Sequence, residues 1–184
     1  MVMNLALALT LTGGESSAEP PPTMPPDPCT TAVPGNVSKK LKELFPEWSV
    51  VHTRLLSRDD RRQFTKRYPT SCAGVVLGDF FGDGTDAFAM LLTRLRGERR
   101  QILVAVARRL KPDSDPWLQI VDGYDDNRLS VPLLVPGDPG NYESVYRDQK
   151  LTARWPVFHL VGGESVEIVF IWTGSYFAKI WLAD

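Results

Sequence analysis

Apolar residues recur along the second half of the chain with the spacing of β-strands. In Gln101–Leu110, Ile102, Val104 and Val106 fall on one face, and the residues between them are also apolar. Two apolar faces predict a strand that is covered on both sides. A similar run, Ala87–Arg94, precedes it, and a turn with a glycine lies between the two. The pattern therefore predicts a central β-hairpin.

Shorter apolar runs predict further strands around this hairpin. They are Glu47–His52, Gly74–Leu77, Trp117–Val121, Val157–Val161, Ser165–Trp172 and Tyr176–Leu182. The last three are separated by short glycine turns, which is typical of a meander. The acidic stretch Asp122–Asn127 is expected to form a turn. Residues 136–150, which are rich in Pro and Gly, are expected to form a loop with one helical turn near Tyr142–Tyr146.

Two short helices are predicted before the strands. The first, Lys39–Phe45, has Asn36 or Ser38 as a candidate N-cap. The second begins after Ser57, where Ser57 and Asp60 resemble a capping box, and it carries one large apolar residue, Phe64, which predicts a surface position. Two helices followed by about six to eight strands predict an α+β fold with an antiparallel meander sheet, as a single domain over residues 36–184.

The N-terminal region predicts export. Residues 2–12 form an apolar run that is too short to span a bilayer but suits the apolar core of a signal peptide, which we place at residues 1–18. Six of the fifteen prolines follow between residues 20 and 28. This composition predicts an extended spacer over residues 19–35. We therefore expect a periplasmic or secreted protein without a transmembrane span.

The chain contains two cysteines, Cys29 and Cys72. In an exported chain such a pair predicts one disulfide bond, and two free thiols are the alternative. The bond would tie the end of the spacer to the segment that leads into the next feature. A zinc site is not expected, because the sequence has no Cys-x-x-Cys motif and no histidine cluster.

An acidic stretch rich in glycine, Gly78–Asp86, precedes the most apolar predicted strand. Asp79, Asp83 and Asp86 lie within eight residues of one another. Calcium binds six to eight hard oxygen atoms, and these carboxylates together with the carbonyl of Thr85 are candidate ligands. The alternative is a tight turn in which the aspartates accept hydrogen bonds from nearby backbone N–H groups.

The segment Asp79–Leu92 resembles the calcium loops of FG-GAP and VCBS-type repeats, which read Asp-x-Asp/Asn-x-Asp-Gly-x-x-Asp and lead into an apolar strand. The resemblance implies Ca²⁺ as a cofactor at this loop. The chain departs from the pattern at Phe81 and Ala87, neither of which has a side-chain oxygen. The whole layout is also similar to small bacterial exported proteins with a Gly-Asp-Phe-x-Gly-Asp-Gly loop and a Trp-rich C-terminal meander. That second resemblance implies no activity.

Charge is unevenly distributed along the chain. The net charge is −1 at pH 7, so the chain as a whole does not favour nucleic acid as a partner. Residues 37–67, however, carry a net +5, and residues 111–184 a net −5. The basic segment is either a solvated helical face or a patch for an anionic partner.

Catalytic motifs are missing from the sequence. The two histidines, His52 and His159, are isolated, and no nucleophile or phosphate-binding motif occurs. We therefore expect a non-catalytic exported binding or inhibitor protein with a protein partner, such as a cell-wall enzyme or an antibacterial effector. The alternative is a small hydrolase that uses Asp or Glu, with Asp122, Asp125 and Asp126 as candidates. The aromatic residues either line a binding face or fill the core; they are Trp48, Trp117, Trp155, Trp172, Tyr176, Phe177 and Trp181.

Overall fold

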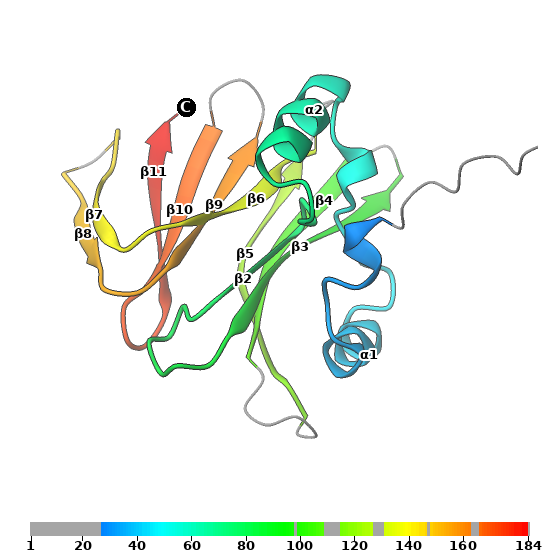
Figure 1. The fold of residues 1–184 in the computed structure, drawn as a ribbon, viewed down its shortest axis with the longest axis horizontal. Helices are drawn as coiled ribbons and strands as arrows, with labels where there is room; N and C mark the ends of the chain where they lie inside the picture. The colour runs from blue at the N-terminus through cyan, green and yellow to red at the C-terminus, as the bar shows by residue number, and fades with distance from the viewer. Residues whose placement is uncertain are drawn as a thin grey trace, which may run out of the picture.

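A computed structural model gives the fold of the chain (Figure 1). It describes residues 27–97, 99–108, 115–126, 131–146, 148–162 and 166–183. The predicted leader and residues 19–26 of the spacer lie outside the described residues. The α+β class is confirmed, because two α-helices accompany antiparallel strands. The described residues form eleven strands, so the expected number of six to eight is wrong.

The elements follow one another with the helices first. The helical elements are η1 (Pro28–Thr30), α1 (Gly35–Leu44), η2 (Thr53–Leu55) and α2 (Arg58–Arg67), where η marks a short 3₁₀ helix. The strands are β1 (Ser49–Val50), β2 (Val75–Gly78), β3 (Ala87–Arg96), β4 (Arg99–Arg108), β5 (Trp117–Asp126), β6 (Leu133–Gly137), β7 (Gly140–Glu143), β8 (Lys150–Ala153), β9 (Val157–Gly162), β10 (Val166–Trp172) and β11 (Phe177–Ala183).

The strands form two main sheets that pack face to face, with the hairpin β7–β8 beside the second sheet (Figure 1). The first sheet has the order β1-β3-β4-β5, and β2 pairs with the other half of β3. The second has the order β11-β10-β9-β6. The predicted hairpin is confirmed as β3 and β4, which pair from Ala87↔Arg108 to Arg96↔Arg99 around Gly97. Gly97 has a φ of +62°, which favours glycine at this turn.

The hairpin β3–β4 is covered on both faces, as its two apolar faces predict. Residues on one face, such as Leu91 and Val104, pack against Phe158 and Phe170 of the second sheet. Residues on the other face, such as Met90, pack against α1 and the two cysteines, Cys29 and Cys72. The central strand Ala87–Leu92 is buried throughout, so it lies in the core.

The two sheets are joined along one side by the backbone. The N–H of Leu134 in β6 donates a hydrogen bond of 2.7 Å to the carbonyl of Ala73, just before β2. Helix α2 covers this seam with Phe64, which packs with Ala73 and Leu56. On the opposite side, Lys179 of β11 contacts Asp122 of β5 at 2.9 Å through side chains.

The predicted N-cap is confirmed for α2 and is wrong for α1. Ser57 caps α2, because its Oγ accepts the N–H of Asp60 at 3.1 Å and its hydroxyl donates to the Asp60 carboxylate at 2.6 Å. Helix α1 begins at Gly35, with Pro34 at the N-cap position and no side-chain cap, so neither Asn36 nor Ser38 caps it. Burial of one side of α1 against the first sheet stabilises this longer helix.

Two expected loops are strands. The acidic stretch predicted as a turn over Asp122–Asn127 belongs to β5 as far as Asp126, and Gly123 there pairs with Leu103. The expected loop over residues 136–150 contains the end of β6 and the hairpin β7–β8, and the helical turn near Tyr142–Tyr146 is absent. Burial explains the hairpin, because Tyr142 and Leu151 pack on the outer face of the second sheet.

Candidate functional site

The Asp79 carboxylate is the centre of the acidic loop. It accepts three backbone hydrogen bonds, from the N–H groups of Gly82 (2.8 Å), Asp83 (3.1 Å) and Gly84 (2.9 Å). The Asp83 carboxylate in turn accepts the N–H of Thr85 at 3.1 Å. This is the network expected of an aspartate-bonded turn, and it uses both oxygens of Asp79.

The loop is anchored in the interior by its two phenylalanines. Phe80 is 1% exposed and packs edge-on against Phe158, with ring centroids 5.1 Å apart. Phe81 packs among Trp117, Trp172 and Phe177 at centroid distances of 4.8–5.8 Å. The residue that breaks the calcium pattern at its third position is therefore a core residue.

A backbone bend lets the loop pass close to the core. Gly82 has a φ of +71°, and a Cβ at this position would lie 1.7 Å from the indole nitrogen of Trp155. Only glycine fits both the backbone conformation and the space. Several of the aromatic residues thus serve packing around this loop, rather than a binding face.

An arginine already occupies the acidic side of the loop. The Arg108 guanidinium forms an ion pair with Asp83 and lies 4.9 Å from the Phe81 ring centroid. Asp86 is exposed, and the loop aspartates do not form one of the groups of converging ligand atoms found among the described residues. Because Asp79 and Asp83 already have partners and Phe81 is buried, these side chains do not fit the six or more oxygen ligands that calcium requires. Calcium at this loop stays a prediction of the sequence motif.

The two cysteines form a disulfide bond. Its Cα atoms are 4.6 Å apart, and it closes a sequence separation of 43 residues. Beside it, Asp27 accepts the N–H of Cys29 at 2.9 Å and contacts Nδ1 of His52 at 3.1 Å. The bond ties η1 to the residues just before β2, and the pair Asp27–His52 ties the residue before η1 to the segment that follows β1.

The pair Asp27–His52 shows opposing electrostatic effects. Desolvation alone would raise the pKa of the Asp27 carboxyl, but the hydrogen bonds from Cys29 and His52 and the charges of His52 and Arg54 lower this pKa below its ordinary value of 3.8. The ligand atoms of Asp27, Cys29 and His52 lie within 4.8 Å of one another. Since the Cys29 sulfur is bonded to Cys72, it offers no thiolate, and two ligands are too few for a closed metal site.

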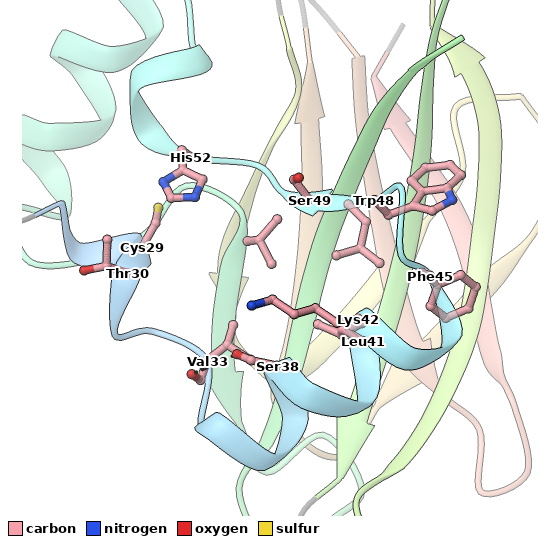
Figure 2. Close-up of a pocket in the computed structure, with 12 residues that line it drawn as sticks. Cys29, Thr30, Val33, Ser38, Leu41, Lys42, Phe45, Trp48, Ser49 and His52 are labelled. Carbon is pink, nitrogen blue, oxygen red and sulfur yellow. Dashed lines mark hydrogen bonds between the residues drawn. The ribbon is translucent and has the colours of Figure 1, made fainter.

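We call the disulfide and the pair Asp27–His52 the clasp. Next to it, a pocket of about 310 Å³ opens between α1 and the edge of the first sheet (Figure 2). Its walls are mostly apolar, with Leu41 and Phe45 on the helix side, Trp48 at one end, and Val50 and Leu92 at the sheet. The full lining is Cys29, Thr30, Val33, Ser38, Leu41, Lys42, Phe45, Trp48, Ser49, Val50, His52 and Leu92.

Lys42 supplies a cation to this pocket. Its side chain extends from α1 along the pocket, and Ser38, one helical turn before it, also lines the pocket (Figure 2). His52 also lines the pocket, and its Nδ1 contacts the Asp27 carboxylate at 3.1 Å. Among the described residues, those that line the pocket include no carboxylate, so Lys42 gives it a positive charge, and the Arg94 guanidinium lies 4.7 Å from the Trp48 ring centroid.

The acids considered for hydrolysis do not face one another across this pocket. Asp122 pairs with Lys179, and Asp125 accepts a hydrogen bond of 2.8 Å from the Gln101 side chain. Asp126 is buried. The second histidine, His159, contacts Glu167 at 2.7 Å on the outer face of the second sheet, away from the pocket. These contacts give the carboxylates structural partners and do not support the hydrolase alternative.

The pocket was missed in the sequence because its lining comes from four separate segments. Residues of η1, α1, β1 and β3 meet there, and no short motif contains them. One signal was available: the apolar face of the first helix continues into Phe45 and Trp48, beyond the proline at position 46.

No protein-family model matches the chain, and no match is found among the curated proteins or the solved structures. Within the described residues, no helix combines the length and the apolar character needed to cross a bilayer.

Proposed function

We propose that this chain is an exported, non-catalytic binding protein that holds a small ligand in the pocket beneath α1. The observation that supports this most directly is the pocket itself, which has a volume at the lower end of the usual range for small-molecule sites, about 300–1,000 Å³. Its mainly apolar wall with a few polar groups is also typical of such sites. Export is supported by the Cys29–Cys72 bond, because disulfides persist in oxidising compartments.

The residues that line the pocket indicate the chemical class of its ligand. Leu41, Val50 and Leu92 favour an apolar body, and Trp48, whose ring also contacts the Arg94 guanidinium, lines one end of the pocket. The Lys42 ammonium at the pocket wall favours a ligand with an anionic group. The ligand class is therefore a small molecule with an apolar or aromatic body and one carboxylate or sulfonate.

A rigid clasp supports binding rather than catalysis. The disulfide and the Asp27–His52 pair fix one end of the pocket before a ligand arrives, which lowers the entropy cost of binding. The inhibitor form of this proposal, with a cell-wall enzyme or an antibacterial effector as its target, is a prediction from the sequence.

A pair of fluorescent probes tests the proposal on the full chain. Anilinonaphthalene sulfonate has an apolar body and an anionic group, and phenylnaphthylamine is its uncharged counterpart. We expect saturable binding of both probes. Lys42→Met should weaken the sulfonate by about fivefold, equivalent to about 1 kcal/mol for a hydrogen-bonded charge, and should leave the uncharged probe unchanged.

Lys39→Met is the matched control, because Lys39 lies on the exposed side of the same helix and pairs with Glu43. It should change neither affinity. Equal weakening of the sulfonate by both variants would show general charge attraction, and the absence of saturable binding of either probe would refute the pocket as a ligand site.

A further inference from the structure

Helix α2 carries a stripe of cations on the side away from the core. Arg58, Arg62 and Lys66 follow one another at a spacing of four residues, which places them along one face of the helix. Phe64, the buried residue of α2, points in the opposite direction. We call the stripe of Arg58, Arg62 and Lys66, all of which are exposed, the α2 basic face.

The stripe differs from other cations of the molecule in its partners. Lys40 contacts Asp115, Arg94 contacts Glu47, and Lys179 contacts Asp122, each within 2.9 Å. In the part of the chain that the structure describes, Arg58, Arg62 and Lys66 have no carboxylate within 4.0 Å. Their charges are therefore directed to solvent.

The stripe places like charges one turn apart along the helix, although Lys66 in the last turn suits the helix dipole. Like charges at a spacing of four residues destabilise an isolated helix, whereas alternating acids and bases would stabilise it. The two acids of α2, Asp59 and Asp60, lie in its first turn, where they offset the helix dipole. An anionic partner would turn the repulsion along the stripe into attraction.

We infer that the α2 basic face docks onto an acidic protein surface, independently of the pocket beneath α1. Two of its three cations are arginines, whose planar guanidinium groups bind carboxylates with two parallel hydrogen bonds. A lipid surface is disfavoured, because a helix that lies in a membrane interface needs large apolar residues facing outward. In α2 the one large apolar side chain, Phe64, faces the core.

The face is also well placed for docking. Helix α2 lies at the outer end of the sandwich, over the seam between the two sheets and apart from α1 (Figure 1). Its attachment through Phe64 and Tyr68 fixes the backbone and leaves the basic side chains free to adapt. A partner could therefore approach without covering the pocket.

Poly-L-glutamate serves as the acidic probe, with the full chain immobilised and the affinity measured at low and physiological salt. We expect binding that weakens by roughly tenfold between about 50 and 200 mM salt, because exposed charges are screened over about a Debye length. Arg58→Glu/Arg62→Glu should weaken it by at least about tenfold at low salt. Lys150→Glu/Arg154→Glu makes the same change in net charge beside the second sheet, and should weaken it by less than about twofold.

Three outcomes would overturn the inference. The first is that poly-L-glutamate does not bind the parent chain at low salt. The second is equal weakening by the two double variants, which would show attraction by net charge alone. The third is tighter binding to vesicles of anionic phosphatidylglycerol than to poly-L-glutamate, which would assign the face to a lipid surface. Far-UV circular dichroism of both double variants checks that α2 remains folded.

Discussion

The acidic loop and the pocket beneath α1 differ in what their residues contact. In the loop, the side chains that resemble metal ligands already have partners within the protein: Asp79 accepts backbone N–H groups and Asp83 pairs with Arg108, while Phe81 fills the core. In the pocket, apolar side chains that look like core border an open space beside Lys42. A motif is therefore weaker evidence for a site than the partners of its atoms.

The same comparison explains how the fold distributes rigidity. The loop is tied to the core through its aromatic rings, so its carboxylates gain fixed geometry from the interior. The pocket depends on a covalent bond and on the Asp27–His52 pair at its end. Substitutions in the two regions should therefore have distinct effects on stability and binding.

The largest loss of stability is expected when a buried phenylalanine of the acidic loop is replaced by alanine. Phe81→Ala should lower the free energy of unfolding by about 4 kcal/mol, because a buried ring is lost and a cavity remains. Phe45→Ala, at the pocket wall, should cost less than half of this, since Phe45 already borders open space. Urea titration of both variants tests the comparison, and equal costs would contradict it.

Removal of the disulfide should cause the second-largest loss of stability. Cys29→Ser/Cys72→Ser should lower the free energy of unfolding by at most about 4 kcal/mol, because the unfolded chain gains the freedom of a long loop. The sulfonate probe should also bind more weakly, since one end of the pocket is released. A variant that unfolds as the parent does in urea would show that the bond contributes little.

A smaller loss of stability is expected in acid, through the Asp27 carboxyl group. The lowered pKa of Asp27 means that the unfolded state binds more protons than the folded state in the acidic range. The stability that this carboxylate contributes is thus present at neutral pH and is lost as pH falls below 3.8 and through the folded-state pKa. Asp27→Asn should reduce the loss of stability between pH 5 and pH 3, measured by urea titration.

Asp115→Asn is the control for this pH effect. Asp115 is 74% exposed and pairs with Lys40 at the surface. Its replacement should leave the pH dependence close to that of the parent chain. An Asp27→Asn protein with the parent's full acid sensitivity would remove the pair Asp27–His52 from the account of the clasp.

The smallest effect is expected from calcium. Because the loop oxygens already accept hydrogen bonds or pair with Arg108, millimolar Ca²⁺ should raise the melting temperature by less than about 1 °C. Chelator serves as the control. A larger rise that chelator reverses and Asp83→Ala abolishes would establish the metal site that the motif predicts.

Local patterns were sufficient to predict the central hairpin and the second helix. Gln101–Leu110 and Ala87–Arg94 alternate over two apolar faces, and Ser57 and Asp60 form the predicted cap. In these segments local propensity and burial agree.

Tertiary contacts decided the segments that were predicted wrongly. The hairpin β7–β8 forms despite its many turn residues, because Tyr142 and Leu151 find an apolar surface on the second sheet. The acidic end of β5 stays extended beside β4, where Asp122 reaches Lys179 of a strand 57 residues away in sequence. The pocket depends in the same way on segments that meet only after folding.

The two long sides of the sandwich are held together by different forces. At one side the backbone of Ala73 and Leu134 joins the sheets, and at the other Asp122 and Lys179 do so through their side chains. The sheets are therefore joined through the backbone under α2 and only through side chains at the edge formed by β5 and β11. Partial separation of the sheets should start at that edge, so amide protons of β5 should exchange with solvent before those of β3.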